Sequence, residues 1–293
     1  LFKHIRQIST PPKRILFVND QLVYGHGQLN PDNLEETRIM AKGWGEILDI
    51  EKGENPGDVL FSFKRGFALL EHQGSDKPTI RASELFSRAI HQTQNKIYVG
   101  TDHGLYCYDN DTLRPFFHDQ ISYQINDIQS NSQGTLFLAT RGGLYVIEND
   151  SVEEIGFDEG LSSLFCSKIH VVNDSTFWVG TNRGINRVIR SHRGTSIDSW
   201  STEDGLISDK INGLAEAGNY YLFVLTDLGI NYLNPKQITV ARPLIKIQLR
   251  DIKVRDEQRS YEAPLHIRPR QRDLSFAFRI LGFKKRENLQ LQY

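Results

Sequence analysis

Apolar runs of strand length, separated by polar turns, recur along most of the chain. In five segments, an apolar run leads to a four-residue polar turn ending in glycine and then to a second apolar run. They are FSFKRGFALLEH (61–72), YVGTDHGLYCYD (98–109), FLATRGGLYVIE (137–148), WVGTNRGINRVI (178–189) and FVLTDLGINYLN (223–234). Two short apolar runs joined by a glycine-containing turn are typical of a β-hairpin, so the pattern predicts five hairpins.

These hairpins recur at a nearly constant period. Their turn glycines are Gly66, Gly104, Gly143, Gly184 and Gly229. The glycines lie 38, 39, 41 and 45 residues apart, and a degenerate sixth copy without the glycine occupies 15–24. Another alternating strand follows each linker, as in INDIQS (125–130) and INGLAEA (211–217). Each period therefore holds about four short strands, which is typical of β-propeller blades that pack face to face.

The turn glycine and the threonine three residues before it are interpreted as structural. Glycine adopts a positive φ at little cost, and a tight hairpin turn requires this backbone conformation. Threonine ends the preceding strand at four turns, where its β-branched side chain suits the pleated backbone. These threonines are Thr101, Thr140, Thr181 and Thr226.

The order of the strands places two kinds of loop on one face of the predicted propeller. If the innermost strand comes first in each blade, the hairpin turns and the linkers between blades meet at the same rim. Loops on a rigid scaffold commonly carry binding groups, so we expect ligand-binding side chains on this rim. The predicted binding residues are Arg65, His103, Tyr123, Arg141, Asn182, Arg183 and Asp227.

A different pattern begins where the repeat fades, near Asn234 and Pro235. Apolar residues then alternate cleanly, as in LSFAF (274–278), which predicts strands of a small antiparallel sandwich. The last strand pattern still continues at Tyr293. An unfinished sandwich would leave an open sheet edge, so we expect the natural protein to extend past this chain.

The sequence therefore predicts an all-β chain with two parts. The first, residues 1–241, is a β-propeller of four-stranded blades with about six readable repeats. The second, residues 242–293, is a truncated immunoglobulin-like β-sandwich. Residues 25–57 fit the repeat poorly, and the pattern leaves open whether they form a blade or a long insertion.

Composition indicates a globular protein and disfavours a protein that binds nucleic acid. Hydrophobic residues make up 39% of the chain, and the formal net charge is −1, which disfavours a basic nucleic-acid-binding protein and an acidic disordered one. The two cysteines, Cys107 and Cys166, are too few for a disulfide framework and are interpreted as small buried hydrophobes.

Known catalytic motifs are not found in the sequence. The nine histidines show no HxxxH or HExxH spacing, and neither a GxSxG elbow nor a phosphate-binding loop occurs. The segment 130–137 has only a weak similarity to the Asp-box of sialidases, with Ser132 in place of the aspartate. We therefore predict no enzyme activity, no cofactor and no metal site.

The repeat resembles the two-component regulator propeller repeat. Its best copies run from Gly160-Leu161-Ser162 to Gly184 and from Val99 to Tyr106, and the resemblance covers about residues 15–234. The tail is similar to the triple-tyrosine immunoglobulin-like domain that follows such propellers, because LSFAF (274–278) matches one of its strands.

The tail also departs from that domain. The three positions that are tyrosine in the family fall on Phe283, Leu291 and Tyr293, so only one is tyrosine here. The family's Pro-Glu pair is replaced by Arg286-Glu287. The position of the tail directly after the propeller supports the resemblance despite these differences.

The resemblance implies the periplasmic sensor part of an inner-membrane histidine kinase or hybrid two-component system. Such a sensor would bind a small solute, with an oligosaccharide as the family's frequent ligand, and would work as a homodimer. A membrane helix and an output domain are expected downstream of this chain. Two alternatives stay open: a protein-interaction propeller, although no Trp-Asp dipeptide ends any strand, and a propeller enzyme such as a polysaccharide lyase or sialidase.

Overall fold

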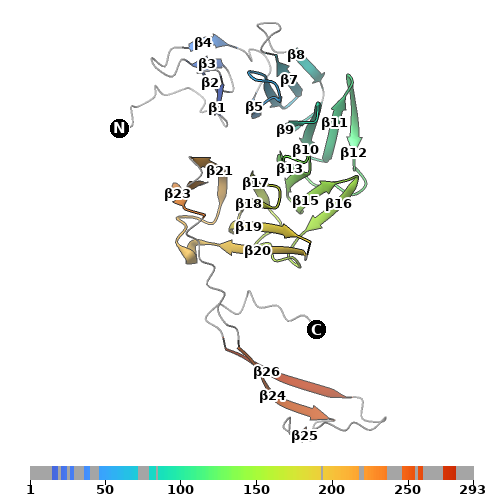
Figure 1. Ribbon diagram of the computed structural model, residues 1–293, viewed down its shortest axis with the longest axis vertical. Helices are drawn as coiled ribbons and strands as arrows, with labels where there is room; N and C mark the ends of the chain where they lie inside the picture. Colours follow the sequence, from blue (N-terminus) through green and yellow to red (C-terminus); the bar gives the residue numbers. More distant parts are fainter. Residues whose placement is uncertain are drawn as a thin grey trace. The chain divides into compact units, whose positions relative to one another are not determined.

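The chain is all-β, and its small antiparallel sheets have a β-propeller arrangement, as the repeat predicted. The structure is a computed structural model (Figure 1). It describes the strands between 15 and 39 and residues 46–71, 79–83, 85–192, 194–217, 221–235, 246–254, 257–259 and 273–281. The chain divides into two compact units, Leu1–Ile238 and Thr239–Tyr293.

Among its described residues the first unit has six sheets, here called blades one to six, which follow one another along the chain. Blade one is β1 (Ile15–Val18), β2 (Gln21–Tyr24), β3 (Gly27–Leu29) and β4 (Glu36–Ile39); blade two is β5 (Ile47–Lys52), β6 (Val59–Phe63), β7 (Gly66–Leu70) and β8 (Thr79–Ser83). Blade three is β9 (Ser87–Thr93), β10 (Lys96–Thr101), β11 (Gly104–Asp109) and β12 (Thr112–Phe116); blade four is β13 (Ile125–Ser130), β14 (Leu136–Thr140), β15 (Gly143–Glu148) and β16 (Ser151–Ile155). Blade five is β17 (Cys166–Val171), β18 (Thr176–Thr181), β19 (Gly184–Ser191) and β20 (Gly194–Trp200); the described strands of blade six are β21 (Ile211–Ala217), β22 (Tyr221–Thr226) and β23 (Ile230–Leu233). A short 3-10 helix, η1 (Thr202–Asp204), lies between blades five and six.

Within each blade the strands pair antiparallel in chain order. The first strand of each blade packs against the first strand of the next, from β1 through β5, β9, β13 and β17 to β21. Figure 1 shows these strands on the inner side, with β12, β16 and β20 outside them. The innermost strand therefore comes first, which is the order on which the sequence argument for a shared rim depended.

The strands that the structure describes within residues 25–57 belong to two blades rather than to an insertion. They contain β3 and β4 of blade one and the inner strand β5 of blade two. The sequence alignment of the degenerate copy was also wrong in register: ILFVNDQLVY forms β1 and β2, whereas the equivalent hairpin is β2–β3, where Tyr24 pairs with Gly27. Gly27 is thus the turn glycine of blade one, and it precedes Gly66 by 39 residues.

Neighbouring blades bury one apolar face against the next. Phe137, Leu144 and Val146 of blade four share a core cluster with Phe177 and Val179 of blade five. The ring centroids of Phe137 and Phe177 are 4.4 Å apart. Full burial of one such side chain contributes roughly 1.5–3 kcal/mol, so packing between blades stabilises each of them.

Glycine at the end of the second strand allows the next inner strand to approach closely. An ideal Cβ on Gly180 would lie 2.5 Å from Cγ2 of Ile211, and one on Gly100 would lie 2.7 Å from Cγ2 of Ile125. In blade four the equivalent position is Ala139, which shares a cluster with the smaller Cys166. Where the residue on the second strand is larger, the facing residue on the next inner strand is therefore smaller.

Blade six leaves the corresponding face exposed among the described residues. The residue after the turn glycine is 0% exposed in blades two to five; these residues are Phe67, Leu105, Leu144 and Ile185. Ile230, at the same place in blade six, is 61% exposed, and Tyr232 beside it is 69% exposed. In this chain, therefore, no described residues bury the far side of blade six.

The second unit contains one antiparallel sheet among its described residues. Its strands are β24 (Lys246–Val254), β25 (Glu257–Arg259) and β26 (Leu274–Leu281), in the order β25–β24–β26. The LSFAF segment lies in β26, and its Phe276 and Phe278 are exposed. A sandwich needs a second sheet, so the immunoglobulin-like fold stays a prediction; Phe283, Leu291 and Tyr293 lie outside the described residues.

Candidate functional site

The threonine hydroxyls organise the hairpin turns. Oγ1 of Thr181 donates to the carbonyl of Gly184 at 2.8 Å and accepts the backbone N–H of Arg183 at 3.0 Å. The same pair of bonds occurs at the turns that begin with Thr101, Thr140 and Thr226. The β-branched shape of threonine therefore explains only part of its recurrence at this position, because the turn also needs the hydroxyl group.

Hairpin turns and blade linkers lie together on one face, as the strand order predicted. The backbone N–H of Gly143 donates to the carbonyl of Leu164 at 2.8 Å, and that of Gly184 donates to the carbonyl of Asp209 at 2.7 Å. The N–H of Gly104 similarly bonds the carbonyl of Tyr123 at 3.2 Å. In each case a turn is joined to the linker that leaves the same blade. We call this surface the turn face.

The inner strands share a β-bulge at their second residue. The pairing register with the neighbouring strand skips one residue in blades two to six. The skipped residues are Leu48, Arg88, Asn126, Ser167 and Asn212. A bulge re-aims the side chain of the extra residue. Here it does so at the end of the inner strand that lies next to the turn face.

Two of these bulge residues bond the next blade. Asn126 Nδ2 donates to the carbonyl of Cys166 at 2.7 Å, and Ser167 Oγ donates to the carbonyl of Ile211 at 2.7 Å. Cys166 and Ile211 are the first residues of the two following inner strands. Asn212, at the same place in blade six, makes no such bond among the described residues.

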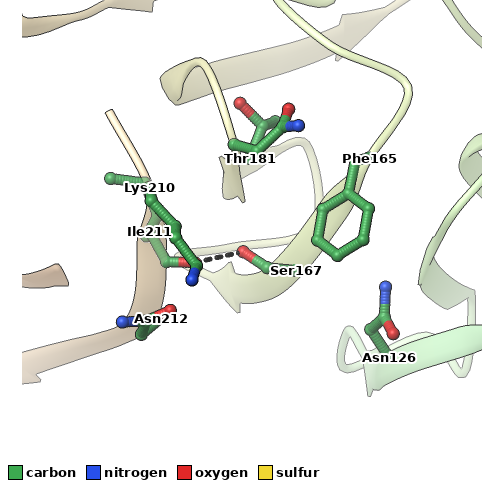
Figure 2. A pocket seen from close by; sticks show the side chains of 8 residues that line it. Asn126, Phe165, Ser167, Thr181, Lys210, Ile211 and Asn212 are labelled. Carbon is green, nitrogen blue, oxygen red and sulfur yellow. Dashed lines mark hydrogen bonds between the residues drawn. The ribbon is translucent and has the colours of Figure 1, made fainter. Parts of the chain in front are cut away.

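A pocket of about 450 Å³ lies over these bulges. Its lining comes from three consecutive blades and consists of Asn126, Phe165, Ser167, Thr181, Asn182, Lys210, Ile211 and Asn212. Figure 2 shows the Phe165 ring on one side, Lys210, Ile211 and Asn212 on the other, and Ser167 between them. The volume suits a small ligand.

An aromatic platform forms one wall of the pocket. The guanidinium carbon of Arg141 lies 5.5 Å from the ring centroid of Phe165, within the range of a cation–π contact. The backbone N–H of Phe165 donates to Ser163 Oγ at 3.0 Å, which fixes the loop that carries the ring. A half-buried ring with a fixed backbone offers a flat apolar surface to a ligand.

Apart from Phe165 and Ile211, the lining residues have polar side chains, and none of them is a carboxylate. Three of its polar side chains, those of Asn182, Lys210 and Asn212, are exposed and have no side-chain partner among the described residues. The carboxylate next to the lysine is occupied elsewhere, since Asp209 accepts the backbone N–H of Thr202 at 2.6 Å. The pocket thus presents one cation and two amides to a solute.

The predicted binding residues all lie exposed on turns or linkers, but only some are near the pocket. Asn182 lines it, Arg183 follows in the same turn, and Arg141 packs on Phe165. Tyr123 packs instead against Gly142, where an added Cβ would lie 2.3 Å from its ring.

Three further predicted residues lie on hairpin turns outside the pocket. Arg65, His103 and Asp227 belong to blades two, three and six, and Asp227 accepts a hydrogen bond from Ser208 Oγ at 2.6 Å. None of the three lines the pocket. Whether the seven predicted residues bind a ligand stays a prediction.

The seven predicted binding residues do not include Asn126, Phe165, Ser167, Lys210 or Asn212, which line the pocket. The bulges that aim three of these side chains depend on strand pairing and are not visible in a hydrophobic pattern. One signal was available: the second residue of the inner strand is polar in four successive repeats, although both faces of such a strand pack against protein. These residues are Arg88, Asn126, Ser167 and Asn212.

A second polar cluster joins three inner strands away from the pocket. His91 Nδ1 lies 2.6 Å from Glu51 Oε1, and His91 Nε2 lies 2.8 Å from Ser130 Oγ. Burial alone would lower the pKa of His91, but the charge and hydrogen bond of Glu51, together with Asp127 and Asp49, raise it above its usual value of 6.5. The cluster therefore links blades two, three and four by a charge-assisted contact.

Both cysteines are buried and unpaired, as predicted. Burial raises the pKa of the Cys166 thiol to about 12, and burial likewise raises the pKa of Cys107. Both thiols therefore stay protonated at neutral pH and act as small core side chains.

Comparison with solved structures places the chain in the β-propeller class. The extracellular domain of a putative hybrid two-component system from B. thetaiotaomicron matches 90% of this chain at 18% identity, with a TM-score of 0.67. Virginiamycin B lyase from Staphylococcus aureus matches 81% of this chain and 88% of its own at 15% identity, with a TM-score of 0.57. PorZ of the Porphyromonas gingivalis type-IX secretion system matches 80% of this chain and 40% of its own at 12% identity, with a TM-score of 0.56.

At these identities the likeness shows the fold alone. The chain spans 38% of the length of the two-component-system domain. No protein-family model and no curated protein matches the sequence. The fold and the site together define a β-propeller with a solute-sized pocket on its turn face.

Proposed function

We propose that this chain is part of an extracytoplasmic ligand-sensing domain of a two-component regulator, and that the pocket on the turn face binds the signal solute. One observation carries the proposal: an aromatic platform and three unpartnered polar side chains converge in one pocket. The repeat's resemblance to the two-component regulator propeller, and the likeness to an extracellular domain of such a system, support the cellular role. Among the described residues, no helix has the length and apolar character that crossing a membrane requires.

A ligand in this pocket would act on the geometry of three blades at once. The pocket-lining Asn126, Ser167 and Asn212 belong to β13, β17 and β21, whose contacts include the two inter-blade bonds described above. A ligand shifts a conformational equilibrium only by its differential affinity for the two states. A site that spans several blades can supply that difference, because each blade movement changes several ligand contacts. We extend the proposal to a homodimeric full-length protein that passes this change across the membrane.

Thermal unfolding in the presence of solutes tests the proposal. We expect one class of solute, with saccharides as the first candidates, to raise the Tm of the chain, and Phe165→Ala to abolish that rise because the platform is lost. Phe157→Ala is the matched control, since Phe157 is an exposed aromatic residue of the same linker that does not line the pocket. A solute that stabilises Phe165→Ala as strongly as the wild type would contradict the site.

The same experiment separates the alternatives. A protein-interaction propeller would show no solute-dependent rise in Tm but would retain a partner protein in the Phe165→Ala variant. A propeller enzyme would convert the solute during incubation, which chromatography of the mixture would detect. Either result would replace the sensor proposal.

A further inference from the structure

The charged side chain in the pocket lining is a cation, and two further cations lie beside the lining. Lys210 lines it, Arg141 packs on its aromatic wall, and Arg183 follows the lining residue Asn182. None of these three cations has a carboxylate partner among the described residues. Other cations of the same blades are paired, such as Lys168 with Asp127 at 2.8 Å and Arg190 with Glu153 at 2.8 Å.

The neighbouring carboxylates interact with groups other than these cations. Asp209 bonds the backbone of Thr202, Asp227 accepts Ser208 Oγ, and Glu216 lies 3.0 Å from His170 Nε2. The pocket itself offers oxygen acceptors only from amides, hydroxyls and backbone. A neutral sugar presents many hydroxyl donors, which a carboxylate accepts most strongly. A cation without an acidic counterpart instead favours a ligand that carries its own negative charge.

The remaining lining selects among anionic ligands. Asn182 and Asn212 each present a donor and an acceptor, which suits hydroxyl groups, whereas Phe165 offers a flat apolar face. The chemical groups of the lining therefore suit a ring compound with one apolar face, several hydroxyls and an anionic substituent. An inorganic anion would leave the platform and the amides without contacts.

We propose that the pocket binds an acidic saccharide, one that bears a carboxylate or sulfate group. Lys210 contacts the anionic group, Phe165 contacts a sugar face, and Asn182 and Asn212 contact hydroxyls. Arg141 and Arg183 add long-range attraction from the rim. This inference rests on the proposed sensor function and narrows its ligand to one chemical class.

Calorimetry with three probes tests the inference: an oligogalacturonate, a sulfated galactose oligosaccharide and a neutral galactose oligosaccharide of the same length. We expect at least one acidic probe to bind at least about tenfold more tightly than the neutral one. Raising the salt concentration from about 0.05 to about 0.5 M should weaken that binding, because the charges are solvent-accessible. Comparison of the two acidic probes distinguishes carboxylate from sulfate as the recognised group.

Variants assign the effect to the pocket. Lys210→Gln should weaken the affinity for the acidic probe by about tenfold or more and leave the affinity for the neutral probe unchanged. Lys64→Gln is the control, because Lys64 is an exposed cation on the hairpin turn of blade two, does not line the pocket and is paired with Glu46 at 3.0 Å. It should leave the affinity for both probes unaltered.

The outcomes separate this inference from the proposed function. If a neutral saccharide binds as tightly as the acidic ones, and Phe165→Ala abolishes that binding, the sensor function stands and the acidic class is wrong. Loss of affinity in Lys64→Gln equal to that in Lys210→Gln would also overturn the inference, because the effect would then be general electrostatics. If no saccharide binds but another solute raises the Tm through Phe165, the saccharide assignment fails.

Discussion

At the residue scale, single polar atoms decide how the repeat is built. The turn threonines provide a hydroxyl that both donates and accepts within the hairpin, as at Thr181. The bulge residues Asn126 and Ser167 each bond the carbonyl that opens the next inner strand. His91 joins Glu51 and Ser130 of two other blades. Each of these atoms bonds a partner within its own turn or about one repeat away in the sequence. The hydrogen bonds therefore recur with the period of the sequence.

The His91–Glu51 contact predicts a pH dependence of stability. The folded-state pKa of His91 is raised, so its stabilising contribution is full below the unfolded value of about 6.5 and is lost as pH rises through the folded pKa. The difference in Tm between the wild type and His91→Gln should therefore be larger at about pH 5.5 than at about pH 9.

Thermal unfolding of both proteins across this pH range checks the prediction. His103→Gln is the control, because His103 lies exposed on a hairpin turn and has no ion-pair partner among the described residues. A difference that stays constant with pH, or grows as pH rises, would show that the His91 pair does not titrate in the folded state as inferred.

At the element scale, blades fit together because facing side chains match in size. Gly180 meets Ile211, Gly100 meets Ile125, and Ala139 shares its cluster with Cys166. The larger the side chain on the inner strand, the smaller its counterpart on the second strand of the preceding blade. Close packing of this kind leaves no room for an added methyl group unless its neighbour shrinks.

Gly180→Ala tests this size matching. The new methyl group would lie 2.5 Å from Ile211 Cγ2, so we expect destabilisation of about 1–3 kcal/mol. Ile211→Cys, which copies the Ala139–Cys166 pair, should recover part of that loss when combined with Gly180→Ala. Denaturant unfolding measures both effects.

Gly156→Ala provides the matched control for this experiment. A Cβ there would lie 3.5 Å from the nearest side-chain atom, an ordinary contact distance, so little change is expected. Additive losses in the Gly180→Ala, Ile211→Cys double variant would contradict direct packing between the two positions.

At the scale of the whole molecule, the blades are equivalent in sequence but not in burial. The residue after the turn glycine is fully buried in blades two to five, yet Ile230 of blade six is 61% exposed. The pocket also draws on blades four, five and six only. Position along the propeller, rather than the repeat itself, therefore decides which copy is core and which is surface.

This difference predicts unequal effects of one substitution. In this chain Ile230→Ser should change the free energy of unfolding little, because its side chain is already in contact with solvent. Ile185→Ser should cost about 3 kcal/mol or more, since it removes a fully buried side chain and buries a hydroxyl. Equal losses in the two variants, measured by denaturant unfolding, would mean that the exposed face of blade six is covered in solution.

Much of the fold could be predicted from local pattern. The glycine turns, their period and the order of strands gave the blades and the turn face, because hairpins form between neighbours in sequence. Blade one was misaligned because its copy retains little of the pattern, and the hairpin at Gly27 was overlooked in favour of the more apolar run beside it. The sandwich of the second unit and its tyrosine positions remain predictions.

The candidate site was only partly predictable, for a physical reason. The sequence by itself determined which residues occupy exposed turns, and so it indicated Asn182, Arg141 and Arg183. Only the tertiary structure decided that Phe165 and Lys210 lie across one pocket from each other, 45 residues apart in the chain. A hydrophobic pattern records the burial of each residue within its own strand. The bulges and blade packing that aim side chains into a shared space arise from contacts between different repeats, which that pattern does not contain.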